Sequence, residues 1–191
     1  MLITTGLGGD GRALAQSARV ASQRLQLLNG EMPTVSELAK VAVAQVQHEL
    51  TRVSGARPFG VTATVLGVDL VNRLKDNQSH AHLKARLFQS ECGGTLNEYD
   101  FCSSGRGRKT CLSTLEELHS KLRRSTDDAS LKLRLAIEGV ARSVFVGDND
   151  AKQVDLWVLH PISGRRGQCR IRCAKEVREL DLQQVASYFT E

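Results

Sequence analysis

The amino-acid sequence predicts an α+β fold, because helical and strand patterns come in runs of like elements. Two helical patterns open the chain, three strand patterns follow, and then come two helices, a strand and a last helix. Strict strand–helix alternation would indicate a parallel sheet instead, since parallel strands need crossover helices. With 191 residues the chain is long enough for one hydrophobic core, so we expect residues 1–191 to form a single domain.

The two opening helices have recognisable ends. Apolar residues recur at helical spacing over residues 11–28, Asp10 is a suitable N-cap, and an Asn-Gly pair at residues 29–30 stops the helix. The sequence TVSE at residues 34–37 matches a capping box. A second helix is therefore predicted over residues 34–54.

Strand patterns follow the helices. Residues 60–71 are rich in Val, Thr and Leu, which is typical of a buried strand. A polar loop is predicted over residues 72–82, and a hairpin is predicted from strands 83–90 and 95–103 around a turn at residues 91–94. The remaining segments are predicted as helices over residues 112–122, 127–145 and 174–188, a turn over 147–150, a strand over 154–159 and a loop over 161–167.

Composition and charge give little support to several function classes. The net charge of +5 comes from basic residues spread along the chain, apart from a cluster at Arg165, Arg166, Arg170 and Arg172. Scattered charge and scarce aromatic residues disfavour nucleic-acid binding, although this cluster keeps it open as a weaker hypothesis. Apolar stretches are too short to span a membrane. We expect neither nucleic acid nor a membrane as a partner.

Metal, cofactor and nucleophile patterns are also weak. The five cysteines have no CxxC pair, which indicates reduced thiols in a cytosolic or nuclear protein. His80 and His82 are expected in the polar loop, not at a metal. No GxSxG sequence occurs, and His48, His119 and His160 cannot be assigned to a nucleophile. We expect no catalytic residue, metal or cofactor.

One glycine motif offers an alternative function. Residues 6–11 match GxGxxG, with residues 1–5 as the preceding strand and Glu31 where a ribose-binding acid is expected. A dinucleotide-binding unit also needs a parallel strand directly after the helix, but here a second helix follows. Asp10 would place a carboxylate beside the phosphate. A small dinucleotide-binding protein therefore remains only the alternative.

Taken in order, several stretches of the chain resemble proteasome α-subunits. They are GLGGDGRAL at residues 6–14, RPFGV at 57–61, LGVD at 66–69, LFQSECGGT at 87–95 and SGRG at 104–107. The ordered series covers most of the chain and is more specific than any one motif. Departures from the family pattern include Cys92-Gly93 in the turn and an insertion at residues 72–82.

The resemblance gives its motif residues structural roles. Pro58 fixes a backbone angle and holds Arg57 extended, and Arg12 can pair with carboxylates or carbonyls near Asp10. Glycines in strands allow close approach of the sheet. The candidate structural residues are Gly6, Asp10, Arg12, Arg57, Pro58, Phe59, Gly60, Gly67, Asp69, Gly94 and Gly105.

The resemblance also implies an architecture and a role. The fold would be an Ntn-hydrolase-like four-layer αββα sandwich that lacks its N-terminal strands, with the chain as the C-terminal two-thirds of the domain. Its partners would be other α-subunits in a seven-membered ring, β-subunits and regulatory caps, in cytoplasm and nucleus. Hydrolysis in this family uses the N-terminal Thr of a β-subunit, so a structural role in ubiquitin-dependent degradation is expected here.

Overall fold

A computed structural model of the chain describes residues 1–75, 78–122, 136, 139, 154–161 and 169–177. The chain divides into two compact units. The first comprises Met1–Cys102 and Pro161–Cys169, and the second comprises Ser103–His160 and Arg170–Glu191.

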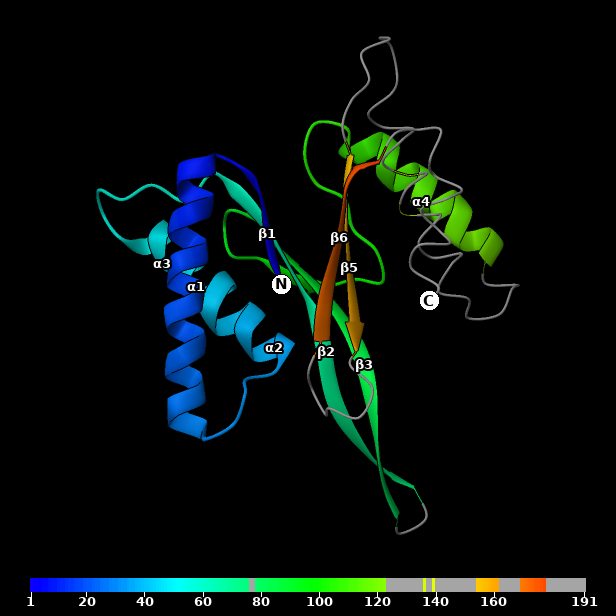
Figure 1. Cartoon of the computed structure of the whole chain (residues 1–191). Helices are drawn as coiled ribbons and strands as arrows, with labels where there is room; N and C mark the ends of the chain where they lie inside the picture. Colours follow the sequence, from blue (N-terminus) through cyan, green and yellow to red (C-terminus); the bar gives the residue numbers. More distant parts are fainter. Residues whose placement is uncertain (76–77, 123–135, 137–138, 140–153, 162–168, 178–191) are drawn as a thin grey trace. The chain divides into compact units, whose positions relative to one another are not determined.

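An antiparallel sheet forms the base of the first unit. Its strands are β1 (Leu2–Gly6), β2 (Val61–Lys75), β3 (Gln78–Ser90) and β4 (Leu96–Glu98), hydrogen-bonded in the order β1-β2-β3-β4. β2 and β3 are the long central pair (Figure 1). β1 and β4 are short and cover only part of the outer edges of this pair.

Helices pack on one face of this sheet (Figure 1). They are α1 (Gly8–Asn29), α2 (Val35–Glu37), a π-helical segment η1 (Leu38–Ala44) and α3 (Gln45–Arg52), the last three being continuous. Alternate residues of β2 face these helices because side chains in a strand alternate between the two faces. The buried core consists of Leu14, Val35, Ala39, Val43, Val61, Ala63, Val65 and Phe88.

The helix ends test the predicted caps. The capping box at Thr34 is confirmed, since its hydroxyl accepts a hydrogen bond from the Glu37 amide and the Glu37 carboxylate accepts one from the Thr34 amide. Gly30 ends α1 at a φ of 70°, as predicted. The prediction of Asp10 as N-cap is wrong. α1 begins three residues earlier than predicted, so Asp10 lies in its first turn.

Two strand predictions need correction. The loop predicted over residues 72–82 is wrong, because β2 continues to Lys75 and β3 begins at Gln78, with residues 76–77 outside the description. Backbone pairing with the opposite strand continues through this polar stretch. The strand predicted over residues 95–103 is shorter, since β4 covers only Leu96–Glu98.

The second unit contains α4 (Arg108–Leu122), which confirms the predicted helix, and most of β5 (Val154–Pro161) and β6 (Cys169–Val177), which form a two-stranded sheet. The helix predicted over residues 174–188 is wrong at its start, because residues 174–177 end β6. Cysteine and isoleucine alternate with arginine at the start of β6, a strand pattern that the prediction missed. Residues 178–188, 147–150 and 162–167 lie outside the described residues, as does the helix predicted over 127–145 apart from helical Ala136 and Gly139.

The α+β prediction is confirmed by the helices and the antiparallel sheet.

Candidate functional site

The first junction joins the start of α1 to the start of β2. The Arg57 guanidinium donates to both carboxylate oxygens of Asp10, from Nη1 to Oδ2 at 2.6 Å and from Nη2 to Oδ1 at 2.8 Å. The Gly60 amide also donates to Asp10 Oδ2, at 2.8 Å. Bidentate pairing of this kind fixes geometry as well as charge. Asp10 therefore holds the segment before β2 against α1.

These contacts change the acidity of both partners. Hydrogen bonds from Arg57 and then from the Gly60 amide lower the pKa of Asp10 to about 2. The pKa of Arg57 is raised by its hydrogen bonds to Asp10. The Asp10 side chain is only 13% exposed, whereas that of Arg57 is 64% exposed. Asp10 is thus ionised throughout the neutral range.

Glycines let the backbone close this junction. Gly6 has a φ of 134°, and a Cβ there would collide with the Gly60 carbonyl. The Leu7 amide donates to the same carbonyl at 3.0 Å. The turn between β1 and α1 therefore packs directly against the backbone of Gly60.

Of the other residues predicted for this segment, some lie at the junction and one lies away from it. The Pro58 carbonyl accepts a hydrogen bond from Arg57 Nη1 at 3.0 Å, and Phe59 packs against the core. Arg12 is exposed on α1, and the Asp10 carboxylate pairs with Arg57 instead. The structure therefore brings Gly6, Asp10, Arg57, Pro58 and Gly60 together but leaves Arg12 at the periphery.

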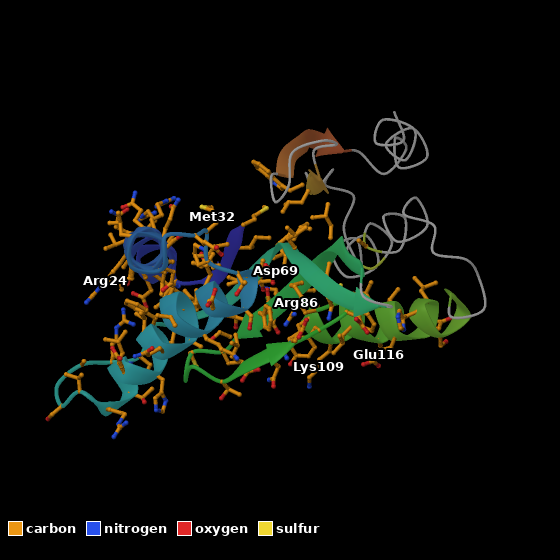
Figure 2. All side chains as sticks on the ribbon, turned by 90° about the horizontal axis from the view of Figure 1, so that it is seen from below. Arg24, Met32, Asp69, Arg86, Lys109 and Glu116 are labelled. Carbon is orange, nitrogen blue, oxygen red and sulfur yellow. The ribbon has the colours of Figure 1, made fainter. Side chains whose placement is uncertain are left out.

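A second junction joins β2 to the start of α2. Asp69 Oδ1 accepts a hydrogen bond from the Val35 amide at 2.8 Å, and Asp69 is 9% exposed. Figure 2 labels Asp69 where β2 passes these helices. A Cβ on Gly67 would lie 2.6 Å from Val35 Cγ2. Gly67 and Asp69 together seat α2 on the sheet, since the carboxylate satisfies one of the free amides of the helix N-terminus.

The last two predicted glycines lie at turns. Gly94 has a φ of 83°, and a Cβ there would lie 2.5 Å from the Ala44 carbonyl oxygen. The turn between β3 and β4 is therefore pressed against the end of η1. Gly105 belongs to the second unit, where it has a φ of 95° and its carbonyl accepts from the Arg108 amide at 3.2 Å.

Sequence reasoning missed a buried polar pair. Gln47 is fully buried; its Nε2 donates to the Val61 carbonyl at 3.0 Å, and its Oε1 accepts from Ser90 Oγ at 2.6 Å. A signal did exist, because Gln47 lies four residues after the buried Val43 and so on the buried side of the helix. The pair joins α3 to both β2 and β3.

The structure overturns the dinucleotide-binding alternative. After α1 the chain enters another helix, α2, and β1 pairs antiparallel with β2 instead of parallel. A Cβ on Gly11 would lie 2.5 Å from Thr4 Oγ1, so the motif glycine serves packing against β1. Glu31 is exposed in the turn after α1.

The described residues carry little else that suggests chemistry. Among them there is no group of three or more His, Cys, Asp or Glu side chains that could hold a metal ion. Cys92, Cys102 and Cys111 are not joined in disulfides. Within the described part of the chain, no helix combines the length and the apolar character needed to cross a bilayer.

Comparison with known proteins gives a consistent family. The family described as Proteasome subunit matches residues 1–152. A Proteasome subunit alpha of Methanococcus vannielii is 35% identical over 118 residues, which is 62% of this chain and 40% of the relative. That of Methanocaldococcus jannaschii is 31% identical over 156 residues, 82% of this chain and 52% of the relative.

A third relative covers more of the chain. Proteasome subunit alpha type-7 of Caenorhabditis elegans is 28% identical over 180 residues, which is 94% of this chain and 64% of the relative. The chain thus spans between 40% and 64% of the length of these three relatives. The family match also supports the Ntn-hydrolase-like form of the α+β fold. Since the match extends over most of its length, the chain belongs to the family of proteasome subunits, and among them to the α type.

Proposed function

We propose that the chain is a non-catalytic, structural α-type subunit of the proteasome core particle. In this role it contributes to the outer ring that scaffolds β-subunit assembly and gates substrate entry. Family membership is the observation that carries the proposal, because the matching residues include the motif junctions of the first unit.

The geometry of the motif residues supports a structural role. The Asp10 carboxylate accepts hydrogen bonds from Arg57 and from the Gly60 amide, and Arg57 also donates to the Pro58 carbonyl, so both charged groups are engaged within the fold. Asp69 is likewise engaged with a helix N-terminus. Residues committed to such contacts are poorly suited to act on a substrate, which would compete for the same hydrogen-bonding atoms.

The absence of catalysis is part of the proposal. Thr4 and Thr5 lie within β1 and pair in register with Ala63 and Thr62. Thr4 also packs against Gly11. Thr4 is therefore placed to hold the strand against α1, and we assign neither threonine a nucleophilic role.

The proposal includes assembly and location. The partners are other α-type subunits in a seven-membered ring, β-type subunits and regulatory caps, in the cytoplasm and nucleus, with ubiquitin-dependent protein degradation as the process. The chain serves as a single domain equivalent to the C-terminal two-thirds of an α-type subunit. The motif residues from Gly6 to Gly105 shape this domain.

The test is incorporation into a large particle. The 191-residue chain, carrying an epitope tag, is expressed in its source cells, and extracts are separated on a glycerol gradient. We expect the tag to sediment with α- and β-type subunits and with peptidase activity. A chain that stays in the slowly sedimenting fractions, while all α positions of the particle are occupied by other subunits, would contradict the proposal.

Two matched variants connect assembly to the first junction. Asp10→Asn/Arg57→Gln removes the ion pair, and we expect less of the tagged chain in the particle. Asp100→Asn/Arg52→Gln makes the same chemical changes at exposed residues and serves as the control. If both variants enter the particle equally, the Asp10–Arg57 ion pair is not needed for assembly.

A further inference from the structure

β1 is an edge strand of the sheet in the first unit. It pairs with β2 on one side, and the strand order β1-β2-β3-β4 places no strand of the described chain on its other side (Figure 1). An edge strand presents backbone N–H and C=O groups that can pair with a further strand. The outer edge of β1 is therefore able to accept an extended segment.

The register shows which backbone groups of β1 point outward. Met1 donates to the Leu66 carbonyl at 2.7 Å, and the Leu66 amide donates to the Met1 carbonyl at 3.0 Å. Along an antiparallel pair, residues that exchange such bonds alternate with residues that do not. Leu2 and Thr4 lie one and three positions after Met1, so their amide and carbonyl groups point away from β2. These two residues supply the bonding groups of the outer edge.

A groove of about 460 Å³ lies beside this edge. Leu2 and Val65 form its floor, and α1 and η1 form its two sides. α1 packs mainly on β1, whereas η1 packs on β2, β3 and β4, so the α1 side of the groove is the side of the outer edge. A segment added to β1 would therefore have the groove on its helix-facing side.

The groove is mostly apolar and carries one charged side chain. Small and aliphatic residues make up most of its sides, namely Ala15 and Ala18 from α1 and Leu38, Ala42 and Val43 from η1. Arg19 of α1 also lines the groove and is exposed, and no acidic residue is among the lining residues. This lining suits an apolar side chain together with a carboxylate.

The course of α1 sets the order of these two side chains. Gly11 packs against Thr4, and α1 then runs back along β1 to Arg19. Eight residues of helix rise about 12 Å, whereas the two residues from Thr4 to Leu2 span about 7 Å. Arg19 therefore lies past Leu2. In a segment antiparallel to β1, the carboxylate follows the apolar residue by two positions, since residues at this spacing share one face.

We propose that β1 and the groove bind an extended segment of another protein by strand addition. The segment is antiparallel to β1, and its residues opposite Leu2 and Thr4 exchange backbone hydrogen bonds with them. Those same residues direct their side chains to the helix side, where the groove takes the apolar one and Arg19 pairs with the acid. Backbone pairing gives the affinity and the groove gives the selectivity. The inference goes beyond the proposed structural role and does not depend on it.

Other occupants fit less well. A second copy of this chain would bring another β1, which has no acid to meet Arg19, and two copies with a net charge of +5 repel one another. A small apolar acid would fill the groove without using the outward backbone groups of Leu2 and Thr4. An extended segment is the occupant that uses both the edge and the groove.

The experiment measures binding of a fluorescent heptapeptide, Thr-Val-Thr-Leu-Thr-Glu-Thr, to the full chain by anisotropy. In antiparallel pairing the amides of Val, Leu and Glu face β1, and those of the intervening Thr residues face solvent. N-methylation of Leu and Glu removes two donors, and we expect affinity to fall about tenfold or more. N-methylation of the two Thr residues that flank Leu leaves the pairing amides intact and is the matched control. We expect it to alter affinity less than about twofold.

Two changes in the chain test the groove independently. Ser22→Phe places a large side chain in the groove, and we expect peptide affinity to fall about tenfold. Ser17→Phe makes the same change on α1 outside the groove lining and is the control. Arg19→Glu should weaken binding about two- to fivefold, and a peptide with Lys in place of Glu should restore it. This restoration would not occur if the variant had simply lost its fold.

Four results would overturn the proposal. The first is that the original chain does not bind the heptapeptide saturably. The second is that both N-methylated peptides bind as well as the parent or are weakened equally, which would exclude strand pairing. The third is that both Phe variants bind the peptide equally. The fourth is a dimer of the chain in sedimentation equilibrium that the peptide dissociates, which would make a second copy the occupant. None of these results bears on incorporation into the core particle, which is measured separately.

Discussion

At the scale of single residues, Asp10 connects segments that are far apart in the sequence. Its carboxylate binds Arg57, 47 residues away, and the Gly60 amide, 50 residues away. The sequence singled out Asp10 but predicted the wrong role for it, that of an N-cap. An N-cap is a local feature that can be predicted from neighbouring residues. The position of Arg57 depends instead on how the intervening helices pack, because they determine where the chain comes back to Asp10.

The acidity of Asp10 predicts how stability depends on pH. The folded pKa is about 2, below the ordinary value of 3.8, so the contribution of Asp10 is complete well above pH 3.8. It declines as pH falls from near that value toward 2, because the unfolded chain binds the proton first. Urea unfolding across this range should show a shallower pH dependence for Asp10→Asn than for the original chain.

A control distinguishes this effect from general acid unfolding. Asp100→Asn removes an exposed carboxylate of the same unit and should leave the pH dependence nearly unchanged. If both variants flatten the curve equally, the contact with Arg57 is not the source of the effect.

The buried pair Gln47 and Ser90 predicts energetic coupling. Ser90→Ala leaves Gln47 Oε1 without this donor, and Gln47→Leu leaves the Val61 carbonyl without its side-chain donor. Each single change should destabilise the fold by about 1–3 kcal/mol. The double variant should cost less than the sum, with a coupling of about 1 kcal/mol in urea unfolding. Strict additivity would show that the two side chains act independently.

At the scale of elements, local signals were reliable where local chemistry decides the structure. The capping box and the glycine that ends α1 are examples, since each depends on a few adjacent residues. The predicted loop over residues 72–82 failed for the opposite reason. Its polar residues are stabilised as strands by backbone pairing between β2 and β3, which composition alone does not reveal.

Two glycines with similar backbone angles predict different costs of substitution. Gly30 has a φ of 70° with no atom near a new Cβ, so Gly30→Ala should cost only about 1 kcal/mol. Gly94 has a φ of 83°, and its Cβ would overlap the Ala44 carbonyl and the His48 amide. Gly94→Ala should cost more than about 3 kcal/mol. Equal unfolding free energies would contradict the close packing of this turn.

At the scale of the whole molecule, the division into two compact units bears on how the chain unfolds. The sequence predicts one domain, whereas the contacts divide the chain into two compact units. Length and composition limit the size of a domain, but they do not determine whether its parts unfold together. The family resemblance could be recognised because its motifs lie at local turns, which short stretches of sequence determine. Such motifs carry no information on how strongly the two units depend on one another for stability.

The single tryptophan allows the prediction to be tested. Trp157 lies on β5 in the second unit and is 47% exposed, so its fluorescence reports on that unit. If the chain is one cooperative domain, Gly94→Ala in the first unit should lower the urea midpoint of Trp157 fluorescence as much as that of far-ultraviolet circular dichroism. A fluorescence transition that does not move would indicate two independently unfolding domains.

The π-helical segment η1 has a consequence for how this gene tolerates change in length. A π-helical turn contains about one residue more than an α-helical turn, so η1 accommodates an insertion without rotating its flanks. Losing one codon between Leu38 and Ala44 would restore ordinary α-helix and leave Val35 and Gln47 on their present sides. The same loss within α1 would turn everything after it by about 100°. In-frame deletions should therefore be better tolerated in η1 than in α1.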